Sequence, residues 1–153
     1  MKNTKQNKRL NIIALRNELQ SCLRRRSELQ KRHDFLWEEI RRGLNRQTQI
    51  RDVTNQIGTE THKVNCIITQ LRRTGQMTHS NCSLARTYLQ NEIARNQKIV
   101  STWIKRIHNV ERGRLGLINS NGVKHTNTTS VRKYVEAKKR KIAEAQRLLA
   151  LIR

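Results

Sequence analysis

Positive charge constrains this chain more than any other feature of its sequence. Thirty-three Lys and Arg residues stand against only eleven Asp and Glu residues in 153 positions, which gives a formal net charge of +22. Like charges at the spacing found in a compact protein repel one another and oppose folding. The sequence therefore predicts a negatively charged partner: a nucleic acid, an anionic membrane or an acidic protein surface.

The composition favours long helices. Proline is absent, and aromatic residues make up only 3% of the chain. Turns in sheet-rich folds use proline, whereas helix interiors exclude it. So few aromatic residues cannot build a large globular core. The predicted fold class is all-α, as a long helical hairpin or coiled-coil-like bundle with a separate basic C-terminal helix after a flexible loop.

A heptad pattern of apolar residues runs through the first long segment. Alternating steps of three and four residues from Ile12 to Ile57 reach mostly apolar side chains. This spacing places one apolar stripe along a helix and favours packing against a second helix. The predicted helix-packing residues are Ile12, Leu15, Leu19, Leu29, Leu36, Ile40, Ile50 and Ile57.

Polar residues interrupt the stripe at Arg26, His33, Gln47 and Thr54. Polar residues at such positions weaken helix pairing, but they also fix its register or its partner. A loosely packed bundle and a device for specific pairing are both consistent with this pattern.

Glycines, polar runs and apolar spacing divide the chain into segments. The polar stretch around Gly75 ends in Ser80 and Asn81, which are residue types that cap helices. A later stretch with three glycines and a Thr/Asn run is typical of a loop or a short hairpin. The predicted segments are a basic arm (1–11), a helical hairpin (12–110, with helices 12–73 and 82–110 and a turn near 74–81), a flexible loop (111–130) and a basic helix (131–153).

The charge is concentrated at the two ends of the chain. Residues 1–26 hold eight basic and one acidic residue, and residues 131–153 hold eight and two, whereas residues 27–57 hold six and five. A nearly neutral centre is typical of a helix that faces protein, while basic ends are free to reach a polyanion. The predicted phosphate-contacting residues are Arg24, Arg25, Arg26, Lys31, Arg32, Lys138, Lys139, Arg140 and Lys141.

Residue patterns that support catalysis are missing from the sequence. Glu38 and Glu39 are adjacent, so they do not face each other on a helix. No phosphate-binding loop or dinucleotide fingerprint occurs. His62 and Cys66 share a helix face, but two ligands do not make a metal site. The sequence predicts a protein without catalytic activity, cofactor or metal.

Three widely separated cysteines, Cys22, Cys66 and Cys82, and no secretory signal core predict free thiols in a reducing compartment inside the cell, the nucleus or the cytoplasm. The first 20 residues are basic with a single acid, as in a mitochondrial transit peptide, although they lack its Ser richness. The mitochondrion is therefore an alternative location. No stretch approaches the roughly 18 apolar residues of a membrane span.

Two functions are consistent with these features. The first is a non-enzymatic helical protein that binds RNA or DNA through phosphate contacts, as a chromatin or packaging factor or as a ribonucleoprotein component. The second is a coiled-coil structural subunit, whose heptads pair with a partner chain or a second copy and whose basic ends contact an acidic surface such as a cytoskeletal polymer. The basic ends favour the first function and the balanced heptads favour the second.

Overall fold

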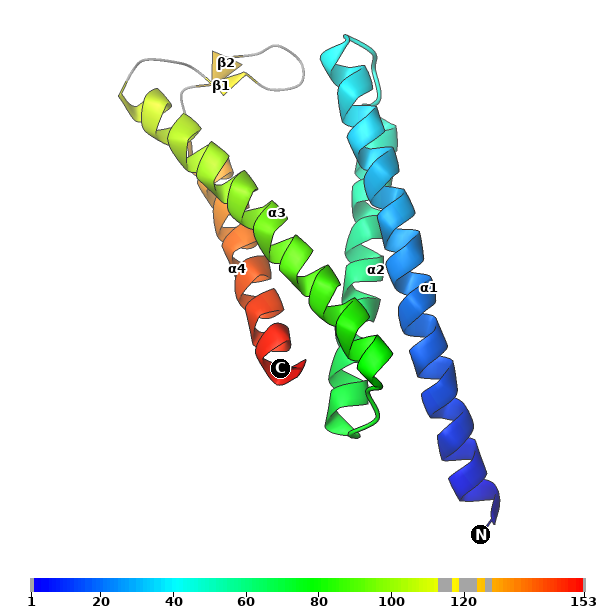
Figure 1. Ribbon diagram of the computed structural model, residues 1–153. Helices are drawn as coiled ribbons and strands as arrows, with labels where there is room; N and C mark the ends of the chain where they lie inside the picture. The colour runs from blue at the N-terminus through cyan, green and yellow to red at the C-terminus, as the bar shows by residue number, and fades with distance from the viewer. Residues whose placement is uncertain (1, 113–116, 119–123, 126–127, 153) are drawn as a thin grey trace. The chain divides into compact units, whose positions relative to one another are not determined.

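The computed structural model is all-α, as the sequence predicts. It describes residues 2–112, 117–118, 124–125 and 128–152, with the side chains of residues 11–112 and 128–152. The elements in chain order are α1 (Lys2–Arg41), α2 (Gln47–Arg73), α3 (His79–Glu111), β1 (Leu117–Ile118), β2 (Lys124–His125) and α4 (Thr129–Ile152) (Figure 1). The chain forms two compact units that divide within α3: residues 1–85 and residues 86–151.

In the first unit, α1 and α2 lie antiparallel along most of their length (Figure 1). We call the stripe of α1 that faces α2 the α1 seam. Leu19 and Cys22 on this seam are fully buried, and Leu36 is nearly so. Near the C-terminal end of α1, Leu36 packs with Ile50 and Val53 of α2. The remaining seam residues are half-buried or buried: Ile12, Leu15, Arg26, Leu29, His33 and Ile40.

Helix α2 carries a matching stripe. Its buried residues recur at steps of three and four, so they lie on one side of the helix. Two heptad stripes of the same chain therefore cover each other and remove their apolar side chains from water. The stripe of α2 consists of the half-buried Ile57 and the buried residues Ile50, Val53, Glu60, Val64, Ile67 and Leu71, and Ile68 beside Ile67 is also fully buried.

The prediction of one helix over residues 12–73 is wrong, because a turn at residues 42–46 divides this segment into α1 and α2. The amide of Gly43 donates to the Ile40 carbonyl, and the amide of Leu44 donates to the Glu39 carbonyl. This pair of bonds ends a helix with a residue in the left-handed region, and Gly43 has a φ of 90°. Gly58, by contrast, lies inside α2.

One position of the predicted stripe differs beyond the turn. The heptad count carried through from α1 selects Ile50, Thr54 and Ile57; Ile50 is buried and Ile57 is half-buried, but Thr54 is exposed and Val53 is buried instead. The hydroxyl of Thr54 donates to the Ile50 carbonyl, so its polar group is satisfied without a partner on α1.

The second turn lies where the sequence predicts it, but α3 begins earlier than expected. Gly75, with a φ of 66°, ends α2 by the same pair of amide bonds as Gly43. Helix α3 starts at His79 rather than Cys82. The Thr78 hydroxyl caps it, because this oxygen accepts a hydrogen bond from the backbone N–H of Asn81 at 3.1 Å. The guanidinium of Arg16 donates to the Gln76 carbonyl at 2.9 and 2.6 Å and ties α1 to this turn.

In the second unit, α4 runs antiparallel beside α3 (Figure 1). An ion pair between Glu111 and Arg132 joins one end of the two helices. The buried apolar residues of this unit lie at helical spacing and are Leu89, Ile107 and Val110 of α3 with Val135, Ala145, Leu148 and Leu149 of α4; the polar Asn96 of α3 is also buried. The two helices thus share an apolar interface.

The segments expected to be irregular contain some regular structure. Residues 2–11, predicted as an arm, belong to α1. Within the predicted loop 111–130, β1 and β2 pair antiparallel, with Leu117 opposite His125; residues 113–116, 119–123 and 126–127 of that loop lie outside the described residues. In the described part of the chain, no helix has the length and apolar character needed to cross a membrane.

Candidate functional site

The basic residues predicted on α1 fall into two groups. Arg24, Lys31 and Arg32 are exposed, and none of the three has an ion-pair partner among the described residues. Their charges are available to an external anion. Arg25 and Arg26, although adjacent to Arg24, are engaged within the first unit.

The burial of Arg26 contradicts the prediction that this residue contacts phosphate. It is only 9% exposed, and its Nε donates to the Thr61 hydroxyl at 2.8 Å. Arg25 is partly exposed, but it contacts Glu18 at 3.0 Å and Glu60 at 3.4 Å. Because Arg26 occupies a seam position, its side chain faces α2 rather than solvent.

The buried Cys22 contacts two carboxylates, those of the exposed Glu18 and the buried Glu60. The Cys22 thiol donates to Glu18 Oε1 at 3.3 Å. Burial, together with hydrogen bonds to Glu18 and Glu60, raises the pKa of Cys22 to about 11. The bonds from Cys22 and then from Arg25 lower the pKa of the Glu18 carboxyl. Cys22 therefore stays protonated near neutral pH and is not a nucleophile.

Thiol labelling is expected to separate the buried and exposed cysteines. Iodoacetamide at about pH 8 should alkylate Cys66, which is exposed, and spare Cys22, because alkylation needs an accessible thiolate. Peptide mass spectrometry after a short reaction measures both sites. The same reaction in urea should label Cys22 fully, and equal labelling of the two sites in the folded protein would contradict this burial.

The basic run on α4 points in several directions, as four consecutive helical residues must. Lys138 is half-buried, with Nζ 5.4 Å from the centre of the Tyr134 ring. Lys139 lies 3.3 Å from Glu136. Arg140 and Lys141 are exposed and have no ion-pair partner in the described chain. The predicted cluster thus presents two unengaged cations and two that contact neighbouring side chains.

Two aromatic rings hold cations on the surface of the second unit. Trp103 of α3 meets Tyr134 of α4 edge to face, with ring centres 5.9 Å apart. Arg106 lies 4.7 Å from the centre of the Trp103 ring, and Lys138 lies over Tyr134. Partial burial raises the pKa of the Tyr134 hydroxyl, against a smaller opposing effect of Arg95. Cation–π attraction favours fixed positions for Arg106 and Lys138.

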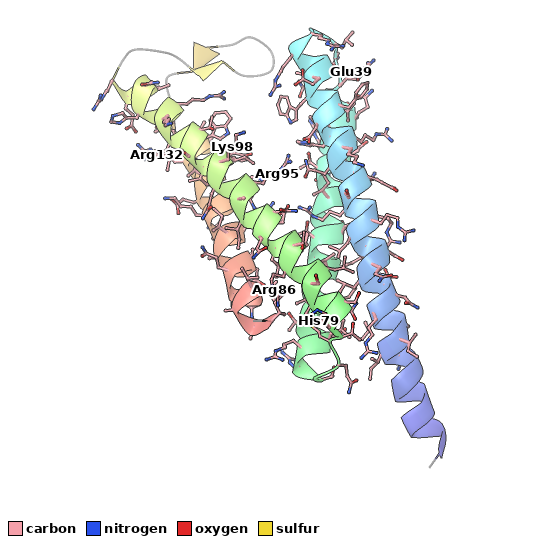
Figure 2. All side chains as sticks on the ribbon, in the orientation of Figure 1. Glu39, His79, Arg86, Arg95, Lys98 and Arg132 are labelled. Carbon is pink, nitrogen blue, oxygen red and sulfur yellow. The ribbon has the colours of Figure 1, made fainter. Side chains whose placement is uncertain are left out.

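A row of cations on α3 was not among the predicted site residues. Lys98 and Lys105 of α3 and Arg112, which directly follows the last residue of α3, are exposed and lie at seven-residue intervals; we call them the α3 basic row. Seven residues are close to two helical turns, so the three side chains lie nearly in line. Lys98 is labelled on α3 in Figure 2. The three residues belong to segments with only a moderate net charge, so the charge of each segment does not indicate the row, whereas helical spacing does.

No carboxylate lies within the α3 basic row. At about 100° per residue, Glu92 lies about 120° from Lys98 around the helix, and Glu111 lies about 120° from Lys105 and about 100° from Arg112. Glu111 is also engaged by Arg132. The buried residues Leu89 and Ile107 lie on the side opposite Lys98. The charged side chains on the side of α3 that carries Lys98 are therefore all basic.

Reactive groups do not gather elsewhere in the described residues. A shallow groove of about 450 Å³ between α3 and α4 has no titratable side chain in its lining, which comprises Gln90, Ile93, Ala94, Gln97, Gln146, Leu149 and Ala150. Cys66 Sγ lies 3.6 Å from His62 Nε2, but no described group of three His, Cys, Asp or Glu residues could hold a metal ion. Exposed positive charge is the strongest functional signal in the described chain.

Comparisons with known proteins reveal no relative of this chain. No protein-family model matches it, and neither does any curated protein or solved structure. Its function has to be inferred from its own residues.

Proposed function

We propose that this protein binds nucleic acid through the backbone phosphates and that the second unit supplies the principal contacts. The observation that carries the proposal is the α3 basic row, in which Lys98, Lys105 and Arg112 span about 21 Å of helix without an intervening carboxylate. A line of fixed cations suits a linear polyanion, because each contact releases condensed counterions.

Neighbouring cations extend this surface. Arg106 is positioned by Trp103 and Lys138 by Tyr134, so these side chains lose less conformational freedom when they bind an anion. Arg140 is exposed on the side of α4 away from the buried Val135 and Ala145, where it can make a separate bidentate phosphate contact. Contacts of this kind position a nucleic acid without reading its sequence. They fit a packaging protein or a ribonucleoprotein component.

The test neutralises the α3 basic row. We expect a Lys98→Gln/Lys105→Gln/Arg112→Gln variant to bind duplex DNA more weakly and to reduce the slope of log affinity against log salt concentration by about 2.7, at roughly 0.9 per lost phosphate contact. Fluorescence anisotropy with a labelled duplex and a structured RNA, repeated at several salt concentrations, measures affinity and slope.

A variant of equal charge provides the control. Arg51, Arg72 and Arg73 are exposed on α2, and their replacement by Gln lowers the net charge by the same three units. The control should retain most of the wild-type slope. An equal loss in both variants would mean that only total charge matters, which overturns the assignment to α3. A wild-type protein that binds neither probe at low salt would overturn the proposed function itself.

The alternative function, a coiled-coil subunit of a larger assembly, has less support. Its heptads were expected to pair with another chain, but within the first unit the α1 seam lies against α2. Leu19 and Cys22 are fully buried there and cannot also contact a second chain. Light scattering tests this alternative, because a stable dimer at low concentration would favour it over a monomer that binds nucleic acid.

A further inference from the structure

Phe35 on α1 has no packing role in the first unit. It is 62% exposed, more than any other large apolar side chain of the described residues. At about 100° per residue it lies on the solvent side of the helix, about 100° from Leu36 and on the side opposite Arg26. Trp37 differs, because its indole N–H donates to His33 at 3.2 Å and the two rings meet edge to face.

Cations without partners lie in line with Phe35. Arg24, Lys31 and Arg42 precede or follow it by eleven, four and seven residues, so all three share its side of α1. Arg32 lies next to them, and none of the four has an ion-pair partner in the described chain. We call Arg24, Lys31, Arg32, Phe35 and Arg42 the Phe35 stripe.

The nearby carboxylates are mostly engaged by other residues. Glu38 pairs with Arg41, and Glu39, labelled at the end of α1 in Figure 2, lies 2.9 Å from Arg46. Glu28 is the one described acid on this side of α1 that has no such pairing. Around the ring, four available cations therefore face one available carboxylate.

We infer that Phe35 stacks on an unpaired base of a single-stranded nucleic acid, while Lys31, Arg32 and Arg42 contact the flanking phosphates. Single strands combine flat apolar bases with a charged backbone, and proteins bind them through aromatic rings set among basic residues. Duplex DNA hides the faces of its bases, and an acidic protein surface would use the cations but not the ring. The inference rests on the proposed nucleic-acid binding, but it assigns a different surface, in the other unit.

The experiment compares two probes that carry equal charge. One is a labelled thymidine oligonucleotide of about 12 residues, and the other is an abasic oligomer with the same number of phosphates. We expect Phe35→Ala in the full chain to lower affinity for the oligonucleotide about tenfold and to leave affinity for the abasic oligomer unchanged. Phe35→Trp should retain binding of both probes, because it preserves an aromatic face.

Ile13→Ala is the matched control. Ile13 is a 45% exposed apolar residue on the same side of α1, about 33 Å from Phe35. It should bind both probes as the wild type does. If Phe35→Ala weakens both probes equally, or neither, or if it instead dissociates a dimer in light scattering, stacking by Phe35 is overturned. In each case, wild-type binding to both probes would leave the proposed function standing, whereas failure of the wild type to bind either probe would overturn the function.

Discussion

Replacing Leu19 with alanine is expected to lower the free energy of unfolding by about 2–5 kcal/mol. Leu19 is one of the fully buried large side chains of the α1 seam. Truncation removes apolar contacts and leaves a cavity, because two long helices with interlocking side chains cannot close around a single missing residue. Urea denaturation of the full chain, followed by far-ultraviolet circular dichroism, measures the loss.

Ile13→Ala on the same helix separates burial from helix propensity. The substitution has similar chemistry, but Ile13 is 45% exposed, so we expect a change within about 0.5 kcal/mol. Comparable losses at Leu19 and Ile13 would contradict the packing of α1 on α2. A small loss of unfolding free energy at both positions would mean that α2 does not pack on α1 around Leu19.

Arg26 and Arg24 are expected to respond in opposite ways to alanine substitution. Arg26→Ala should lower the free energy of unfolding by about 1.5–3 kcal/mol, the range for a hydrogen bond that involves a charged group. It removes the donor to Thr61 and the buried aliphatic stem of the arginine. Arg24→Ala removes an exposed side chain and should change stability by less than about 0.5 kcal/mol.

Binding should follow the reverse order. Arg24 can reach a phosphate, so its loss should weaken binding of a single-stranded probe and reduce the salt slope by about 0.7. Folded Arg26→Ala protein should bind that probe as the wild type does. Anisotropy titrations at several salt concentrations measure both variants. Stronger loss of binding at Arg26 than at Arg24 would restore Arg26 as a phosphate contact and contradict its placement on the seam.

The face of α1 that packs could be read directly from the sequence. Leu19 and Leu36 follow a heptad count that depends only on the geometry of one helix. The same count includes Arg26, so its burial was also accessible, but its place in a run of three arginines suggested a surface role. A run of like charges indicates composition, whereas helical phase decides which member faces the neighbouring helix.

The turn at Gly43 was harder to predict. Ile40 and Ile50 both fall on the same heptad count, with Gly43 and Gln47 between them, so the spacing of the apolar residues does not mark the break. Glycine by itself does not mark the break either, because Gly58 lies inside α2. A glycine ends a helix when turning the chain back lowers the free energy of the fold. Here that favourable free energy comes from packing α2 against α1.

The α3 basic row and the Phe35 stripe could be predicted from the sequence only in part. Both consist of residues at helical spacing, so helical phase alone groups their members. Their exposure depends on which side of each helix is covered, and for α3 this required the position of α4. The Trp103–Tyr134 contact joins residues 31 positions apart in the sequence and had no local signal.

The sequence by itself determined that the chain is helical, strongly basic and striped with apolar residues, because these properties depend on composition and on the geometry of one helix. Only the tertiary structure decided that α2 of the same chain covers the α1 seam and which cations remain unpaired. These outcomes depend on contacts between residues far apart in the chain. Burial and pairing, rather than the number of charges, select the basic residues that can meet a nucleic acid.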